Sequence, residues 1–364
     1  MSQGTGRIGV LTSGGDAPGM NAAVRAVTLI AAQAGVEVLG VMRGYEGLLE
    51  RQLRPLTRKV GGRLAPEHDV DGAAHLGGSL LGSARCKAFY EAEGRARGAA
   101  ALKELDGLVV IGGNGSLTGA RMLAAEHGAR VVGIPASIDN DIGCTSSAIG
   151  VDTALNTIVE ACDRISDTAR AHRRAFIVEV MGRQSGYLCM ASAIAAGADA
   201  ALFREEGRSP TDLVRAVTEV VKRGFEAERG KDRVLVIKAE GVEIPCTRLA
   251  REVEEALRPA IGDVEIRATV LGHVVRGGNP SFLDRMIASR FALAATTALL
   301  EGKTDVMTAW QPATSGGEPT QDRSVQLFPL TRVLEETAAL LDGTSGVTKH
   351  RVALMQKAAG VLSL

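Results

Sequence analysis

Two aspartates and a serine stand close together in segment 135–142 (PASIDNDI), where an apolar, strand-like run gives way to polar residues. Residues i and i+2 of an extended chain point to the same side, so Asp139, Asp141 and the Ser137 hydroxyl are expected to face one site. Two convergent carboxylates suit one general base and one ligand of Mg²⁺. A solvated acidic turn without chemistry is the alternative at this stage.

Two glycine-rich loops each follow an apolar run: residues 13–19 (SGGDAPG) and residues 112–119 (GGNGSLTG). Backbone N–H groups of such loops, together with the N-terminus of a following helix, bind anions. The second loop lacks the glycine spacing of a dinucleotide fingerprint, and no P-loop sequence occurs. Either loop alone could be a turn without a ligand, but the pair predicts a polyphosphate lying across one edge of a sheet.

Basic residues recur at the ends of the predicted strands. Guanidinium groups bind phosphate through two parallel hydrogen bonds, so several of them match a doubly phosphorylated reaction complex. Any single one could instead form a surface ion pair. The candidates are Arg85, Arg174, Arg183, Arg267, His273 and Arg276.

The elements that must position these residues are short β-branched runs alternating with longer Ala- and Leu-rich segments. This alternation predicts an α/β fold with mostly parallel sheets, whose ligands bind at the carboxyl ends of the strands. Two polar segments, 51–78 and 310–324, are expected to be loop-like, residues 331–341 to form a helix, and residues 344–364 a short appendage. The expected strands are the runs RIGVLT, VEVLGVM, GLVVIG, RVVGIP, AFIVEV, DAALF, RVLVIK and RATVLGH.

Composition narrows the function further. The 364 residues are enough for two domains, and 42 basic residues balance 42 acidic ones, which argues against nucleic-acid or membrane partners. No apolar run is long enough to span a bilayer and no signal-peptide pattern is present, so a cytoplasmic protein is expected. The five cysteines are scattered without a C-x-x-C pair and are interpreted as packing thiols.

Taken together, these motifs closely resemble the ATP-dependent 6-phosphofructokinase family. Six blocks match in the family's order across roughly residues 7 to 300: LTSGGDAPGMNAAVR, GGSLLGSAR, GGNGS, IPASIDNDI, VEVMGRQSGY and RATVLGHVVRGG. The resemblance implies transfer of the γ-phosphoryl group of ATP, with Mg²⁺, to the 1-hydroxyl of fructose 6-phosphate, a reaction of glycolysis.

The resemblance also implies two similar Rossmann-like three-layer domains with the active site in the cleft between them. Residues 1–150 with about 275–305 would bind ATP, and residues 151–274 with about 306–364 would bind the sugar phosphate. A homotetramer, or a homodimer, with shared active sites is expected.

The family's roles carry over to matching positions. Asp139 would be the base, Ser137 would lie beside the transferred group, and Arg85 and Arg183 would neutralise the transition state. ATP would be bound by Gly15, Arg85, Cys86, Gly113, Asn114, Gly115 and Ser116, and the metal ion by Asn114 and Asp141. The sugar phosphate would be bound by Ser137, Ile138, Asp139, Met181, Gly182, Arg183, Glu240, His273, Val274, Val275 and Arg276, with Arg174 and Arg267 reaching in from a neighbouring subunit.

Three positions bear on the choice of donor and metal. Relatives that use pyrophosphate carry Asp and Lys where this chain has Gly115 and Ala136, so ATP is the expected donor. Most active relatives carry Asp in place of Asn114, whose amide oxygen brings no charge to the metal. A weakly active or regulatory paralogue, and a kinase of the same fold using another ketose phosphate or pyrophosphate, therefore remain as alternatives.

Overall fold

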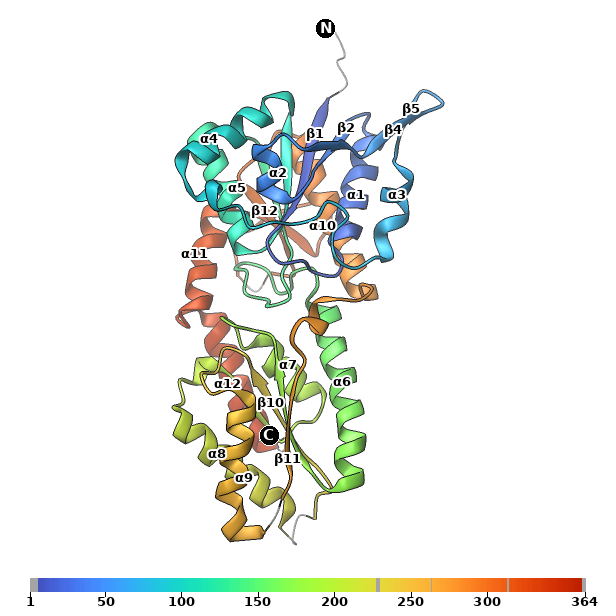
Figure 1. The fold of residues 1–364 in the computed structure, drawn as a ribbon. Helices are drawn as coiled ribbons and strands as arrows, with labels where there is room; N and C mark the ends of the chain where they lie inside the picture. Colours follow the sequence, from blue (N-terminus) through green and yellow to red (C-terminus); the bar gives the residue numbers. More distant parts are fainter. Residues whose placement is uncertain (1–5, 227–229, 263, 313, 362–364) are drawn as a thin grey trace. The chain divides into compact units, whose positions relative to one another are not determined.

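The computed structural model describes residues 6–226, 230–262, 264–312 and 314–361 (Figure 1). The chain forms two compact units. The first comprises Met1–Thr153 and Arg276–Ala339, and the second comprises Ala154–Val275 and Leu340–Leu364. The expectation that residues 306–339 belong to the second domain therefore differs from the structure, in which strands from this segment extend the sheet of the first unit.

The first unit is built on a mixed sheet in the order β13-β14-β12-β7-β6-β1-β2-β3. The five strands from β12 to β2 are parallel, whereas β3, β14 and β13 are antiparallel to their neighbours. The bounds are β1 (Arg7–Ser13), β2 (Glu37–Val41), β3 (Leu53–Pro55), β6 (Gly107–Gly112), β7 (Val131–Pro135), β12 (Val306–Trp310), β13 (Glu318–Pro319) and β14 (Val325–Pro329). Helices cover both faces of such a sheet, so its central strands are apolar throughout.

Right-handed crossovers decide which helix covers which face. The connection from β1 to β2 runs in the opposite direction along the sheet from the connection from β6 to β7, so α1 and α5 lie on opposite faces. Helix α1 (Met20–Gln33) packs against α10 (Phe282–Leu300), whereas α5 (Asn114–His127) lies with α2 (Gly44–Leu49) and α4 (Ala92–Ala101), as Figure 1 shows.

The second unit has a smaller sheet of four parallel strands in the order β11-β8-β10-β9. By the same crossover rule, α7 covers one face, and α8 and α9 pack together on the other. Helix α12 contacts α7, where the Arg351 guanidinium lies 4.4 Å from the centroid of the Tyr187 ring. The bounds are β8 (Ala175–Val180), β9 (Ala200–Leu202), β10 (Val234–Ala239), β11 (Ile266–Val270), α6 (Val151–His172), α7 (Tyr187–Ala195), α8 (Pro210–Phe225), α9 (Cys246–Ile261) and α12 (Gly346–Val361).

The predicted α/β fold with mostly parallel sheets is confirmed, and each predicted strand is present. The polar segment 51–78 is more regular than expected, because it contains β3, the hairpin β4 (Thr57–Val60) and β5 (Arg63–Pro66), and a short helix α3 (His68–Asp71). The predicted helix 331–341 corresponds to α11 (Leu330–Leu341). The expected appendage contains the helix α12.

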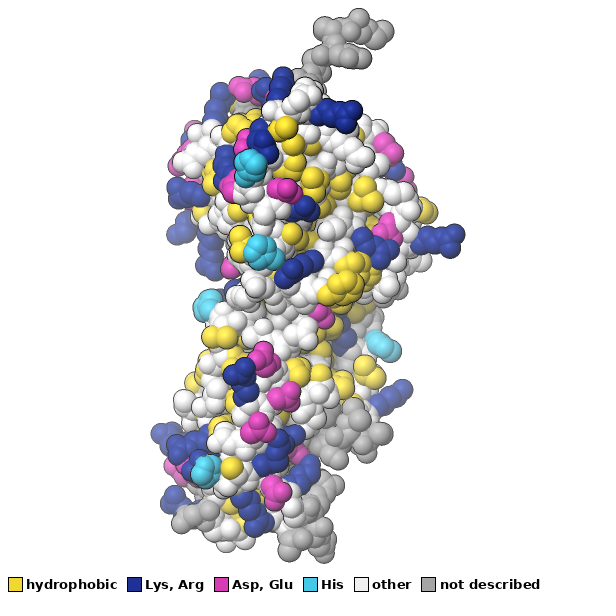
Figure 2. Space-filling model, turned by 90° about the vertical axis from the view of Figure 1, so that its right-hand side faces the viewer, with side chains coloured by type: hydrophobic (Ala, Val, Ile, Leu, Met, Phe, Trp, Pro, Cys, Tyr) yellow, Lys and Arg dark blue, Asp and Glu magenta, His cyan; other side chains and the backbone are white. Residues whose placement is uncertain are grey.

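On the face shown in Figure 2, basic and acidic side chains are interspersed over the surface. This distribution agrees with the equal numbers of the two kinds of charge in the sequence. Within the part of the chain that the structure describes, no helix combines the length and apolarity needed to cross a lipid bilayer.

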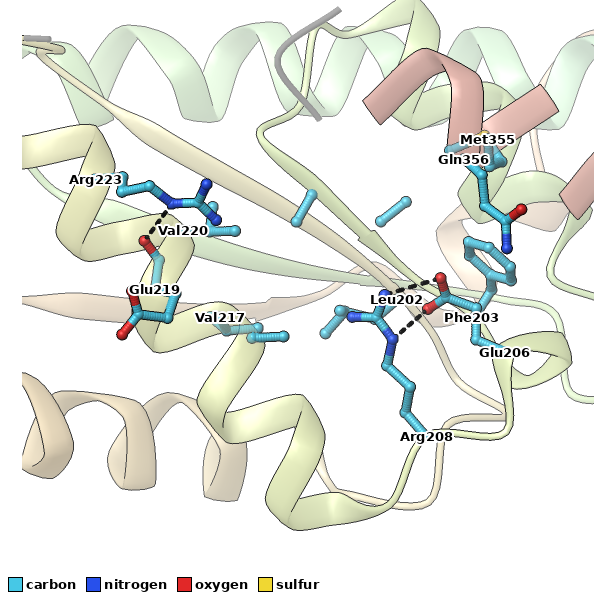
Figure 3. A pocket seen from close by; sticks show the side chains of 13 residues that line it. Leu202, Phe203, Glu206, Arg208, Val217, Glu219, Val220, Arg223, Met355 and Gln356 are labelled. Carbon is cyan, nitrogen blue, oxygen red and sulfur yellow. Dashed lines mark hydrogen bonds and ion pairs between the residues drawn. The ribbon is translucent and has the colours of Figure 1, made fainter. Parts of the chain in front are cut away.

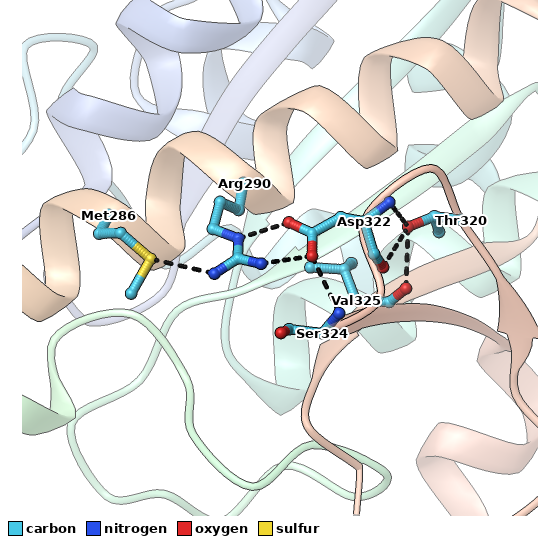
Figure 4. A network of polar contacts seen from close by, with 6 residues as sticks. All are labelled: Met286, Arg290, Thr320, Asp322, Ser324 and Val325. Atoms are coloured by element: carbon cyan, nitrogen blue, oxygen red, sulfur yellow. Dashed lines mark hydrogen bonds and ion pairs between the residues drawn. The ribbon is translucent and has the colours of Figure 1, made fainter.

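A polar network fastens the loop between β13 and β14 to α10 (Figure 4). Arg290 forms a two-pronged ion pair with Asp322, and its guanidinium carbon lies 4.6 Å from the centroid of the buried Trp310 ring. Asp322 also accepts a hydrogen bond from the Ser324 backbone N–H at 2.9 Å. The hydrogen bond from Arg290 holds the pKa of the Asp322 carboxyl below its usual range. The contribution of Asp322 to stability is therefore present at neutral pH and is lost as the pH falls through this lowered pKa.

We expect the substitution Asp322→Asn to lower the free energy of unfolding by about 1 to 2 kcal/mol at pH 7, because it removes one partner of a charge-assisted pair. The difference from the wild-type protein should shrink as the pH falls below about 4, because the Asp322 carboxyl of the unfolded wild-type chain takes up a proton there before the folded one, whose pKa is lowered. Urea denaturation at pH 7 and pH 3.5 measures both values. Asp163→Asn, which changes an exposed carboxylate on α6, is the control, and a deficit that stays constant with pH would contradict the assignment.

Candidate active site

The two glycine-rich loops and the acidic loop all start at the carboxyl ends of neighbouring parallel strands in the first unit. Ser13 at the end of β1 pairs with Gly112 at the end of β6, which in turn pairs with Pro135 at the end of β7. The first two strand ends approach so closely that a Cβ atom on Gly112 would lie 2.5 Å from the Ser13 carbonyl oxygen. Only glycine fits at this position. The register of the three strands brings the three predicted loops to one edge of the sheet.

The second glycine loop forms the N-terminus of α5, with Gly113 as its N-cap residue and Asn114 as its first helical residue. The N–H groups and the positive dipole end of this helix suit a phosphate group. Among the described residues, the buried Ser116 Oγ has no hydrogen-bond partner. Gly115 is exposed, and a Cβ atom there would meet nothing within 4 Å. The loop therefore offers an unsatisfied hydroxyl and open space at its rim.

Tyr45 holds this loop in place, although nothing in the sequence pointed to it. Its hydroxyl donates a hydrogen bond to the Ser116 carbonyl oxygen at 2.6 Å, and its ring stacks on Phe89 with centroids 4.0 Å apart. Burial raises the pKa of the Tyr45 hydroxyl, so it stays protonated and keeps donating.

The first glycine loop turns at Gly14, whose φ of 89° lies in the left-handed region that favours glycine. The Ser83 hydroxyl donates to the Gly14 carbonyl oxygen at 2.5 Å. Next to it, Arg276 donates to the Asp16 carbonyl oxygen at 3.3 Å and would lie 2.8 Å from a Cβ atom on Gly15. Arg276 thus belongs to the first unit.

A cavity of about 410 Å³ opens beside this loop, and its lining includes the predicted residues Gly15 and Arg85. Cys86 follows Arg85 and is half-buried. The remaining lining residues, which the sequence did not single out individually, are Gly14, Asp16, Ser79, Gly82, Ser83 and Ala84.

The acidic loop is arranged differently from the expectation. Strand β7 ends at Pro135, so the alternation of an extended chain does not apply to Asp139 and Asp141. The chain instead turns between them at Asn140, which has a φ of 47°. Ser137 Oγ donates to Asp141 Oδ1 at 3.1 Å and accepts from the Asp139 backbone N–H at 3.3 Å. The hydroxyl therefore links the two acidic residues, and Ile138, which stands between Ser137 and Asp139, is buried.

A buried carboxylate that the sequence analysis missed fixes the position of this loop. Asp284 at the start of α10 accepts hydrogen bonds from the Gly150 and Thr153 N–H groups, both at 2.8 Å, and from the Thr153 hydroxyl at 2.5 Å. Burial raises the pKa of Asp284. The neighbouring Ile149 exchanges backbone hydrogen bonds with the acidic loop, its carbonyl accepting from Ser137 N–H at 3.1 Å. Asp284 thus holds the Gly150 backbone, and the adjacent Ile149 in turn holds the Ser137 backbone.

In the second unit, the predicted sugar-phosphate residues Met181, Gly182 and Arg183 follow the end of β8, and Glu240 follows the end of β10. Glu240 N–H donates to the Val180 carbonyl oxygen at 2.9 Å, and the Arg183 guanidinium lies 3.4 Å from Glu240 Oε1. The Arg183 side chain is 84% exposed. The structure thus brings these four predicted residues together.

The segment after β11 carries four further predicted residues in a short 3₁₀ helix, Gly272–Arg276. Val275 is buried, whereas His273 is exposed and Val274 is 70% exposed. Leu271 N–H donates to the Glu179 carbonyl oxygen at 3.0 Å, which ties the beginning of this segment to β8.

Arg174 and Arg267 lie at the other end of the same sheet. Arg174 immediately precedes β8 and Arg267 is the second residue of β11, so both are near the amino ends of strands whose carboxyl ends carry the other sugar-phosphate candidates. A strand of six residues is roughly 20 Å long. Both guanidinium groups form ion pairs with one carboxylate, Glu265. The structure therefore groups these two arginines with each other and separates them from Met181 and Glu240.

A second cavity of about 360 Å³ lies between β9, α8 and α12 (Figure 3). None of the predicted site residues lines it. Its arginines are engaged within the protein, Arg208 with Glu206 at 3.0 Å and Arg223 with the Glu219 carbonyl oxygen at 3.3 Å. Nothing in its lining indicates a ligand.

The chain is similar to proteins of known family. The chain is 46% identical over 307 residues to ATP-dependent 6-phosphofructokinase of Thermotoga neapolitana, covering 84% of this chain and 90% of the relative. It is 45% identical over 299 residues to the Bacillus subtilis protein of the same name, covering 82% and 87%. Phosphofructokinase of Pichia pastoris in the T-state has a similar structure, with a TM-score of 0.82 and 31% identity; the match covers 99% of this chain but only 40% of that longer chain.

The model of one protein family, described as phosphofructokinase, matches residues 7–299, which include both glycine loops, the acidic loop and the ends of β8, β10 and β11. On this match and on the identity to its relatives, the chain belongs to the phosphofructokinase family.

Proposed function

We propose that this protein is an ATP-dependent 6-phosphofructokinase, which transfers the γ-phosphoryl group of ATP to the 1-hydroxyl of fructose 6-phosphate in glycolysis. The observation that carries the proposal is the convergence of the two glycine loops and the Ser137–Asp141 loop at the ends of β1, β6 and β7. The names of the relatives in Thermotoga neapolitana and Bacillus subtilis support the choice of donor and acceptor.

In the proposed mechanism, Asp139 accepts the proton of the sugar 1-hydroxyl while that oxygen forms a bond to the γ-phosphorus. The bond from phosphorus to the bridging oxygen breaks, and ADP leaves. Charge spreads over the equatorial oxygens of the transferred group, so positioning and electrostatics supply most of the rate enhancement. Arg85 and Arg183 are assigned to neutralise this charge, and Ser137 is assigned a place beside the transferred group.

The proposed ATP site comprises Gly15, Arg85, Cys86 and the loop from Gly113 to Ser116. The cavity beside Gly15 and Arg85 and the unsatisfied Ser116 hydroxyl support this assignment. Open space at Gly115 favours a nucleotide over pyrophosphate, since an aspartate in that position would narrow the rim.

Mg²⁺ is proposed to be held by Asp141 and Asn114 together with the ATP phosphates. Among the described residues, no group of three or more His, Cys, Asp or Glu side chains could hold a metal ion. This fits Mg²⁺, which commonly uses one or two protein ligands and completes its shell with phosphate oxygens and water. When bound, the ion would neutralise phosphate charge. Ser137 keeps Asp141 oriented through the 3.1 Å hydrogen bond.

The sugar phosphate is assigned to Ser137, Ile138 and Asp139 with Met181, Gly182, Arg183, Glu240 and the segment His273–Arg276. The opposite placement of Arg174 and Arg267 supports the proposal that they serve the site of a neighbouring copy, in a homotetramer or homodimer with shared sites. A cytoplasmic location accords with this activity.

The activity is tested with purified protein in an assay that couples fructose 1,6-bisphosphate formation to NADH oxidation, comparing ATP with pyrophosphate across a Mg²⁺ titration. We expect turnover with ATP and none with pyrophosphate. Turnover with pyrophosphate alone, or binding of fructose 6-phosphate without turnover, would contradict the proposal and favour the alternative donor or a regulatory paralogue.

The substitution Asp139→Asn should lower kcat by about 10²- to 10⁴-fold, which is the usual contribution of a positioned base. The dissociation constant for fructose 6-phosphate, measured by calorimetry, should stay within about threefold, because the amide has the same shape. Asp232→Asn, which makes the same chemical change at an exposed position, controls for non-specific effects. A nearly wild-type kcat would remove Asp139 from the mechanism.

The substitution Asn114→Asp should lower the Mg²⁺ concentration needed for half-maximal activity, because a carboxylate adds negative charge to the metal site. Initial rates at saturating ATP and fructose 6-phosphate across a Mg²⁺ titration measure this value. Unchanged Mg²⁺ dependence together with unchanged kcat would exclude a role for residue 114 in metal binding.

A further inference from the structure

The most deeply buried charged side chain of the second unit is one that the proposed reaction does not use. Lys238, on β10, is 1% exposed. Its Nζ donates to Glu179 Oε2 at 2.8 Å and to the Ala239 carbonyl oxygen at 3.1 Å. An ammonium group so far from water requires a charge partner, and Glu179 supplies it from the adjacent strand β8.

The parallel register explains how the two side chains meet. Lys238 and Glu179 are direct partners in the pairing of β10 with β8, so their side chains leave the sheet on the same face. The thiols of Cys189 and Cys246 are near Lys238, and burial raises their pKa values to about 12 and about 11. Both thiols are therefore uncharged at neutral pH and do not replace Glu179 as the counter-charge.

The pair stands directly below the loops assigned to the sugar phosphate. Glu179 is two residues before Met181, and Lys238 is two residues before Glu240. Above the pair, Glu240 N–H donates to the Val180 carbonyl oxygen at 2.9 Å and Gly241 N–H to the Gly182 carbonyl oxygen at 3.2 Å. On the other side, the Glu179 carbonyl oxygen accepts the Leu271 N–H that begins the segment containing His273.

We infer that Lys238 is a positioning residue for sugar-phosphate binding: it holds and neutralises Glu179, so that this carboxylate neither competes for Arg183 nor repels the phosphate. The Glu179 side chain is 18% exposed, and its charge lies at the end of the strand that leads to Arg183. Without Lys238, the Glu179 carboxylate would be left partly buried and without its counter-charge, beneath the site that binds the phosphate dianion of the sugar. The inference rests on the proposed function and assigns to it a residue that contacts no substrate.

The test is a cycle of three variants: Lys238→Met, Glu179→Gln and the two combined. We expect Lys238→Met to raise KM and the calorimetric dissociation constant for fructose 6-phosphate by about tenfold or more, while KM for ATP stays within about twofold. The combined variant removes both charges and should return the fructose 6-phosphate constants to within about threefold of wild type. Lys349→Met, on the exposed surface of α12, is the matched control.

The melting temperatures of the variants show whether a change in fructose 6-phosphate binding comes from lost positioning of the site or from a general loss of structure. If Lys238→Met changes KM for ATP, kcat and KM for fructose 6-phosphate in parallel, or leaves the fructose 6-phosphate constants unchanged, the inference is overturned. If the combined variant binds as weakly as Lys238→Met, neutralisation of Glu179 is not the cause and the inference also fails. Failure of the proposed function looks different, because the wild-type protein would then show no turnover of fructose 6-phosphate with ATP.

Discussion

The parallel register of β1, β6 and β7 is the constraint on which the candidate site depends. Ser13, Gly112 and Pro135 occupy equivalent levels of three adjacent strands, so the chain leaves the sheet three times at one edge. The close approach of Gly112 to the Ser13 carbonyl, and the hydrogen bonds that the Gly150 and Thr153 N–H groups donate to Asp284, keep the loops at this level. A slip of one residue in any of these strands would separate the phosphate-binding loops from the acidic loop.

Different kinds of chemical group position the loops of the two units. In the first unit, backbone groups, small residues and neutral hydroxyls such as Tyr45 and Ser83 hold the glycine loops, and the buried Asp284 carboxylate holds the acidic loop. In the second unit, charged side chains lie within and beside the sheet, as Lys238 and Glu179 show.

Much of this arrangement could be predicted from the sequence, because apolar runs such as GLVVIG and AFIVEV mark parallel strands and the functional loops follow directly after them. The turn at Asn140 could not be predicted, because the alternation of side chains along a strand holds only as far as Pro135, where β7 ends. The assignment of 306–339 failed because β12 and β14 join the first sheet through pairings distant in sequence. Asp284 and Lys238 gave no local signal; their roles appear only when their strand and helix neighbours are known.

The Glu265 carboxylate shared by Arg174 and Arg267 has a consequence for any phosphate that approaches this end of the sheet. Two cations around one anion leave the cluster with a net positive charge, and neither guanidinium is the sole counter-ion of Glu265. A phosphate that draws one arginine away leaves the carboxylate still compensated by the other. Exchange of partners can thus proceed without leaving the Glu265 carboxylate uncompensated.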